Sequence, residues 1–314
     1  MFIAASESGP PSITALNQYL HKDDHLRAFL LVDPYAHEPL MQAFIEEFPC
    51  ETFCVPLKFA SFKGDQLPRL IQLNPKSKAL VDESAALMLV QQTQVMAGSS
   101  SICGWLRSEA CGAVIARHLA ACMERTFFEG NRWWCLRWQD CRVLEWIWPA
   151  LSPRQKTDLL GPIVEWWALD RRGKLRQYSS ATPRALPTGR PGFLLDATQR
   201  THVRQCALAQ TIISGWLTFS PELPPDYLQR VEDILTLTTK HAVGKPEDVA
   251  LLAAYSLQVH LRLLAHPKIH ALIHQSMKGA ALLSTLLGAV SDVQWEAMRA
   301  ELDDIYFDAE SSKS

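Results

Sequence analysis

The segment LRAFLLV, Leu26 to Val32, decides the fold of the first half of this chain. Apart from Arg27 it is a short continuous apolar run, and Asp33-Pro34 ends it, which is typical of a fully buried strand. An amphipathic pattern from Glu38 to Phe48 follows and predicts a helix. The chain therefore opens with a strand and a helix.

The pattern of alternating strands and helices continues to about residue 180. Further strands are predicted at Thr52–Leu57, Arg69–Leu73, Ser100–Leu106, Trp133–Trp138 and Pro162–Leu169. Helices are predicted at Lys76–Gln92, Ala110–Phe127 and Cys141–Ala150, with another that Ser152-Pro153 opens. We therefore expect residues 25–180 to form a mixed lobe, α+β or α/β, with a central sheet flanked by helices and a strand order that the sequence leaves open.

The second half of the chain has a different pattern. Pro, Gly, Ser and Thr are dense from Ser179 to Gly192, which predicts a linker over residues 181–196. Helical periodicity then recurs at Ala197–Phe219, Pro225–His241, Pro246–Leu264, Pro267–Leu287 and Asp292–Tyr306. We expect an all-helical lobe over residues 197–307, with a flexible start at 1–24 and a disordered tail at 308–314.

Composition limits the possible partners. The formal charge of −2, from 31 basic and 33 acidic residues, lacks the basic excess of a nucleic-acid binder. No stretch has the roughly 18 apolar residues that span a membrane, and Met1 to Ile13 lacks a basic start followed by an apolar run. The eight cysteines are scattered, some in apolar helical patterns such as Cys111 and Cys122, as expected of buried thiols. We expect a cytoplasmic protein without disulfides.

Motifs of catalysis and of cofactor binding do not occur in the sequence. It has no GxGxxG or GxxxxGK[ST] phosphate loop and no GxSxG nucleophile elbow. Cys50 and Cys54 lack a second Cys/His pair at zinc-finger spacing. His266, His270 and His274 recur every four residues, but His266 precedes Pro267 and should lie outside the helix. We therefore expect no enzyme, no cofactor and no metal.

The run RWWCLRWQDCRVL, Arg132 to Leu144, is the densest unusual segment. It places Arg137, Asp140 and Arg142 at a predicted strand-to-helix turn. The Asp140 carboxylate would stabilise the start of the helix by accepting from the free backbone N–H groups of the first turn. Either arginine could also pair with this carboxylate. These contacts would explain the turn without a ligand. A contact with a protein partner is the alternative interpretation.

Three segments in this order resemble a known family, the type VI secretion effector chaperones, also called Tap or TEC. The segments are FLLVDP (Phe29 to Pro34), GWLRS (Gly104 to Ser108) before a helix with ARHL, and LRWQDCRVL (Leu136 to Leu144). The last is similar to the family's pattern of arginine, aromatic, aspartate, proline and arginine, with Cys141 where proline is usual. The following stretch LSPRQKTDLLGPIVEWW also resembles the family, so the similarity covers about Leu26 to Leu175.

The resemblance implies a non-enzymatic protein that holds a toxic effector, often by the effector's N-terminal region, and delivers it to the VgrG spike while staying in the cytoplasm. Aromatic and arginine side chains are the usual anchors of such a contact. The candidate protein-binding residues are Arg107, Trp133, Trp134, Arg137, Asp140, Arg142 and Trp148. Two alternatives remain, an enzyme with a site between the lobes around His118, Asp140 and Arg107, and a structural part of the secretion machine.

Overall fold

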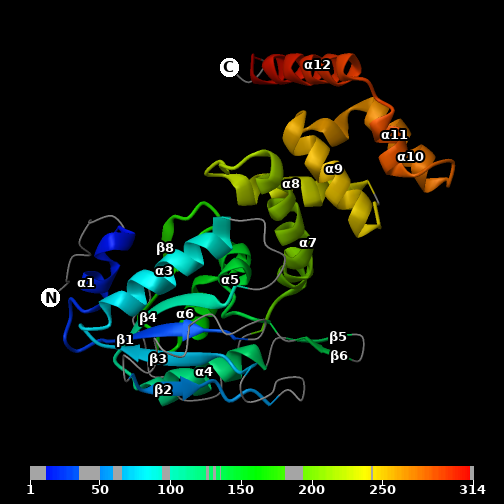
Figure 1. Ribbon diagram of the computed structural model, residues 1–314. Coiled ribbons are helices and arrows are strands. Elements are labelled where there is room, and N and C mark those ends of the chain that lie inside the picture. Colours follow the sequence, from blue (N-terminus) through cyan, green and yellow to red (C-terminus); the bar gives the residue numbers. More distant parts are fainter. Residues whose placement is uncertain are drawn as a thin grey trace. The chain divides into compact units, whose positions relative to one another are not determined.

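The chain divides into two compact units, Met1–Arg204 and Gln205–Ser314, which we call the N-terminal and C-terminal units. The computed structural model describes residues 12–34, 50–58, 66–93, 100–124, 127–129, 132–134, 136–180, 194–241 and 243–311. The N-terminal unit holds a sheet with helices, and the C-terminal unit is built of helices (Figure 1). This is the mixed lobe of strands and helices followed by a helical lobe that the sequence predicts.

The sheet of the N-terminal unit has six strands in the order β2-β3-β1-β4-β7-β8. They are β1 (Arg27–Val32), β2 (Thr52–Cys54), β3 (Arg69–Leu73), β4 (Ile102–Ser108), β7 (Glu165–Leu169) and β8 (Leu175–Tyr178). Every neighbouring pair is antiparallel, so of the two predicted classes the fold is α+β. The apolar run Leu26 to Val32 contains β1, which pairs with β3 on one side and with β4 on the other.

Helices cover both faces of this sheet, so its central strands are buried along nearly their whole length. In Figure 1, α1 (Leu16–Leu20) and α3 (Lys78–Thr93) lie on one face, and α4 (Gly112–Met123) lies on the other. Five of the six residues of β1 and all seven of β4 are buried. The largest wholly buried side chains are Trp105, Trp138, Trp166 and Trp167. The tryptophans of this unit are thus mainly core residues.

Gly104 in β4 occupies a position that only glycine fits. Its φ of +129° lies where residues with a side chain are strained, and the β1–β4 register shifts beside it, between Leu31 and Val32. A Cβ at this position would lie 2.3 Å from the backbone oxygen of Trp167 and 2.8 Å from the indole nitrogen of Trp166. The missing side chain lets β4 and β7 approach each other.

The structure corrects several predicted boundaries of the N-terminal unit. Residues 1–24 were predicted to be flexible, but η1 (Ile13–Ala15) and α1 are helical, because Leu16 and Leu20 are buried in the core. The predicted strand Trp133–Trp138 is shorter, since β6 (Arg132–Trp134) ends before a turn at Trp138–Asp140. The predicted turn at Asp170–Lys174 is present, yet β8 follows it and was missed.

Local signals after the turn are confirmed. The chain continues through α5 (Cys141–Ile147), η3 (Trp148–Ala150) and α6 (Pro153–Leu160). Ser152 begins α6 with a capping box, in which its hydroxyl accepts from the backbone N–H of Gln155 and the Gln155 side chain accepts from that of Ser152. The predicted helix Glu38–Phe48 lies outside the described residues, as does most of the predicted linker 181–196.

The C-terminal unit begins within α7 (Ala197–Phe219) and continues through α8 (Tyr227–Lys240), α9 (Pro246–Gln258), η4 (Leu263–Ala265), α10 (Pro267–Met277), α11 (Leu283–Gly288) and α12 (Asp292–Ser311). Two predicted helices are thus each divided in two. The break between α10 and α11 contains Gly279, whose φ is +77°. The tail 308–314 was predicted to be disordered, but the backbone of α12 stays helical to Ser311. In the described part of the chain, no helix is long and apolar enough to cross a membrane.

Candidate functional site

Arg107 on β4 is a buried structural residue. Its Nη1 donates to Glu165 Oε2 at 2.9 Å, and its Nη2 donates to Asp23, which follows α1. Tyr19 of α1 donates to the other oxygen of Glu165 at 3.2 Å, and Trp167 Nε1 donates to Glu165 at 3.1 Å. Arg107 was predicted to contact a partner, but only 1% of its surface is exposed, so a partner could not reach its side chain. It ties α1 to the sheet.

The ionisation of this cluster follows from its contacts. Burial alone lowers the pKa of Arg107, but hydrogen bonds to Asp23 and Glu165 outweigh burial and leave the pKa raised. The hydrogen bond from Arg107 likewise holds the pKa of Asp23 below its ordinary value. Arg107 and Asp23 are therefore both charged at neutral pH.

Asp140 and Arg142 form the turn that the sequence singled out. Asp140 is the N-cap of α5, and its Oδ1 accepts from the backbone N–H of Arg142 at 3.1 Å. The Arg142 guanidinium donates to both carboxylate oxygens, at 3.1 and 3.0 Å. Both residues are buried, so the structural interpretation of this turn is confirmed, and neither side chain is free to anchor a partner.

Arg137 has a partner that the sequence did not indicate. Its Nη2 donates at 2.5 Å to Asp33, the wholly buried residue that ends β1, and Gln139 Nε2 donates to the same oxygen at 2.7 Å. Burial alone lowers the pKa of Arg137, but the charge of Asp33 raises it above the ordinary value. A quarter of the Arg137 side chain stays exposed. The turn before α5 is thus fastened to the end of the central strand.

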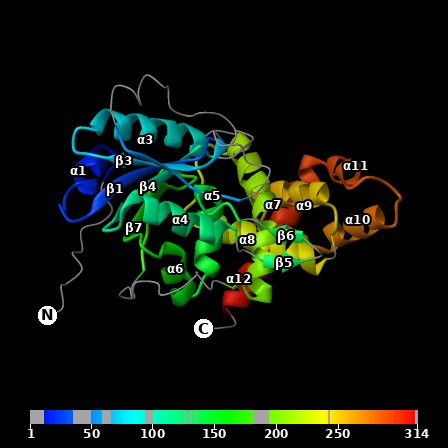
Figure 2. The ribbon, with the colours of Figure 1, turned by 90° about the horizontal axis from the view of Figure 1, so that it is seen from below.

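The three predicted tryptophans lie in two places. Trp148 on η3 is partly exposed, with its ring edge against Tyr178 at 5.2 Å and the Lys156 ammonium over its face at 5.4 Å. Trp133 and Trp134 belong to β6, which pairs with β5 (Phe127–Glu129) as a separate two-stranded hairpin. In Figure 1 and Figure 2 this hairpin extends beyond the end of the six-stranded sheet. The side chains of residues 125–135 lie outside the described structure.

The residues of the enzyme alternative have separate partners. Asp140 is held by Arg142, and Arg107 by two carboxylates, whereas His118 on α4 has its Nε2 2.8 Å from the Leu159 carbonyl oxygen. Cys122 lies 3.5 Å from the same nitrogen. Burial raises the pKa of the Cys122 thiol to about 12, so it stays protonated at neutral pH and is no nucleophile.

Cys111, Cys122 and His266, which the sequence singled out, lie at helix starts or in the core. Cys111 was predicted to be a buried thiol, but it is the exposed N-cap residue of α4; Cys122 is buried as predicted. His266 lies outside α10 as predicted, where its ring accepts from the backbone N–H of Lys268 and its Nε2 lies 2.9 Å from Glu301. Among the residues that the structure describes, no three His, Cys, Asp or Glu side chains are grouped to hold a metal ion.

Sequence reasoning missed Asp23, Asp33 and Glu165, the carboxylates that pair with the arginines. Asp33 was interpreted only as a strand terminator. Its arginine is 104 residues away, and the partners of Arg107 are 84 and 58 residues away, so no local pattern could indicate them. For Asp33 and Glu165 the one available signal was their place at the end and at the start of an apolar strand, where a buried charge requires a partner.

Replacing Asp140 with alanine should lower the free energy of unfolding by about 2 kcal/mol, because α5 loses its N-cap and Arg142 loses its carboxylate. Asp140→Asn keeps a capping oxygen and should lose about half as much. Urea unfolding followed by tryptophan fluorescence measures both values. Equal losses in the two variants would mean that the cap contributes nothing.

Residues 28–158 match the model of a protein family described as a domain of unknown function, DUF4123. No curated protein and no solved structure matches the chain. The matched span runs from β1 into α6, so it contains the Asp33–Arg137 and Asp140–Arg142 pairs and the β5–β6 hairpin.

Proposed function

We propose that this protein is a non-enzymatic adaptor, a chaperone that holds a toxic effector of a type VI secretion system and helps to load it onto the VgrG spike. The observation that carries the proposal is where the family match lies. Residues 28–158 contain all three segments on which the resemblance to the effector chaperones rests, FLLVDP, GWLRS and LRWQDCRVL. Such an adaptor would act in the cytoplasm.

The β5–β6 hairpin is the part of the N-terminal unit that best suits a contact with the effector. Its six paired residues include Phe127, Phe128, Trp133 and Trp134, and aromatic residues are enriched in the hot spots of protein interfaces. Within the described residues, its backbone pairs with no strand of the main sheet. Arg107, Asp140 and Arg142, by contrast, are engaged inside the unit.

Co-expression with its neighbouring genes, among which the proposal predicts a toxin gene and a spike gene, tests the proposal. We expect the tagged protein to retain the toxin and a VgrG protein through a stringent wash, as mass spectrometry would show. The double variant Trp133→Ala/Trp134→Ala should retain at least about tenfold less toxin, because two aromatic anchors are lost. Leu194→Ala, at a residue 80% exposed in the same unit, is the control and should retain the toxin fully.

Two results would contradict the proposal. The adaptor function fails if neither toxin nor spike is retained by the unaltered protein. The hairpin assignment alone fails if the tryptophan variant, with an unchanged circular dichroism spectrum, retains as much toxin as the control. Arg137→Glu is less informative, since it also removes the partner of the buried Asp33.

A further inference from the structure

The strand β2 lies at one edge of the six-stranded sheet, with α4 beside it (Figure 1). On its paired side, the Val55 N–H donates to the Pro68 carbonyl oxygen at 2.7 Å. The hydrogen bonds of an antiparallel pair use every second residue, so the backbone of Phe53 also faces β3, whereas the backbone groups of Thr52 and Cys54 point away from it. In the described part of the chain, no strand pairs with this outer side of β2.

An open groove of about 440 Å³ lies beside this free edge, between β2 and α4. A Cβ at Gly112 would lie 2.2 Å from the Phe53 ring, so this glycine lets the ring lie against the start of α4 and fixes the side of the groove. We call it the edge groove, and most of its lining residues are apolar. They are Phe53, Cys54, Pro56, Ala113, Ala116 and Arg117.

Arg117 is the charged residue in this lining. It is exposed, and its Nε donates to the Ala113 carbonyl oxygen at 3.3 Å, one turn earlier in α4. Among the described residues no carboxylate forms an ion pair with it. A guanidinium binds a carboxylate through two parallel hydrogen bonds. Arg117 thus offers a carboxylate-binding group at the apolar groove.

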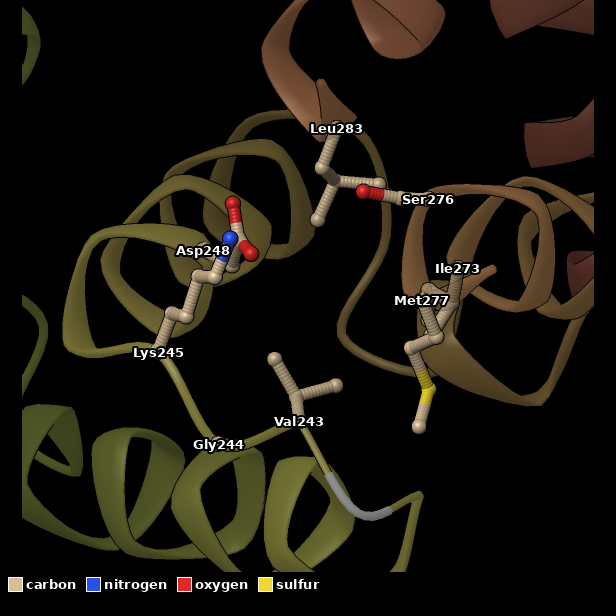
Figure 3. Close-up of a pocket in the computed structure, with 8 residues that line it drawn as sticks. All are labelled: Val243, Gly244, Lys245, Asp248, Ile273, Ser276, Met277 and Leu283. Atoms are coloured by element: carbon tan, nitrogen blue, oxygen red, sulfur yellow. The ribbon is translucent and has the colours of Figure 1, made fainter. Parts of the chain in front are cut away.

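The pocket in the C-terminal unit has no comparable set of groups. It measures about 240 Å³ and lies between the loop that joins α8 to α9, α10 and α11 (Figure 3). Val243, Ile273 and Leu283 line it. Lys245 and Asp248, which have opposite charges, line it as well. The described part of this unit is helical and supplies no strand edge, so the pocket favours no particular class of ligand.

We propose that the edge groove binds an extended segment of a partner protein, which adds a seventh strand to the sheet. The backbone groups of Thr52 and Cys54 bond the segment, an apolar side chain enters the groove, and the carboxylate of an Asp or Glu two residues away pairs with Arg117. Residues two apart lie on the same side of a strand, so both side chains face α4.

The free backbone edge decides the form of the occupant. A helix would leave the N–H and C=O groups of Thr52 and Cys54 unpaired, whereas an added strand bonds them and places alternate side chains in the adjoining groove. The edge groove contains no residue of the β5–β6 hairpin. The inference therefore goes beyond the proposed contact with the effector and does not depend on it.

Fluorescence anisotropy with the full chain and labelled peptides tests the edge groove. The parent peptide is capped at both ends and alternates threonine with isoleucine and one glutamate, so that its carboxylate belongs to a side chain. Two derivatives carry N-methyl groups on alternate residues, one derivative for each set. Because every second N–H of an added strand faces β2, one derivative should bind at least about tenfold more weakly than the parent, and the other should bind within about threefold of it.

Variants of two lining residues locate the binding. Arg117→Glu should weaken binding of the parent at least about tenfold, and it should bind a peptide with lysine in place of the glutamate within about threefold of the original affinity. Ala113→Phe fills the groove and should weaken binding of the parent at least about tenfold. Arg154→Glu, at a side chain 92% exposed on α6, and Val114→Phe, on α4 outside the lining, are the controls and should bind the parent as the unaltered protein does.

The edge groove is overturned if both N-methylated peptides bind as the parent does, if the parent does not bind at about 1 mM, or if either lining variant binds it as the controls do. It is also overturned if the protein dimerises in sedimentation experiments and Ala113→Phe abolishes the dimer, since a second copy is then the occupant. Retained toxin without peptide binding would refute the edge groove alone. Peptide binding without any retained toxin would refute the adaptor function alone.

Discussion

Gly104→Ala is expected to lower the free energy of unfolding of the N-terminal unit by at least about 3 kcal/mol. Two costs combine, the strain of a side chain at a φ of +129° and a Cβ that would lie 2.3 Å from a backbone oxygen of β7. The neighbour cannot yield easily, because Trp166 and Trp167 are wholly buried on either side of the contact.

Urea unfolding followed by tryptophan fluorescence measures this loss, since eight of the ten tryptophans lie in the N-terminal unit. Gly215→Ala in α7 is the control, because a Cβ at Gly215 would have no atom of the described chain within 4 Å. Alanine in a helix should stabilise the C-terminal unit by up to about 1 kcal/mol. A loss below about 1 kcal/mol for Gly104→Ala would refute the tight approach of β4 and β7.

Arg107→Met should cost the N-terminal unit about 3 kcal/mol, because it leaves the Glu165 carboxylate part-buried without its guanidinium. Tyr19 and Trp167 still donate to Glu165, which holds the loss at the lower end of the range for broken buried pairs. The double variant Arg107→Met/Glu165→Gln should lose less than the sum of the two single variants, since no unpaired charge then remains.

Arg107→Met should also change how the free energy of unfolding depends on pH in the acidic range. Arg107 lowers the pKa of Asp23 in the folded state, so this contribution is present above the unfolded pKa and is lost as the pH falls through the folded pKa. The loss therefore occurs below about pH 4 in the unaltered protein and should be absent in Arg107→Met. Free energies of unfolding between about pH 2.5 and 7 measure this dependence.

Lys78→Met is the matched control, because Lys78 pairs with Asp82 on an exposed surface of α3. It should change the free energy of unfolding by less than about 0.5 kcal/mol. If Arg107→Met costs no more than this control, Arg107 does not tie α1 to the sheet.

The sequence predicted those elements whose signal is local. The continuous apolar runs of β1 and β4 identified the central strands, and the 3.6-residue period identified α4, because each pattern lies within one element. Ser152-Pro153 and Asp140 with Arg142 were likewise visible as helix starts. The strand β8 was missed because it has only four residues and its middle two, Arg176 and Gln177, are exposed.

By itself, then, the sequence determined a first lobe of mixed strands and helices, a second lobe of helices and the capped turn before α5, since propensity, period and capping act over a few residues. Tertiary structure alone decided the antiparallel order β2-β3-β1-β4-β7-β8 and the partners of the buried charges. Asp33 and Arg137 lie 104 residues apart in the chain, and burial makes their pairing necessary only once the sheet has formed. The pocket lined by Val243, Ile273 and Leu283 also depends on tertiary structure, because it exists only where the α8–α9 loop, α10 and α11 pack together.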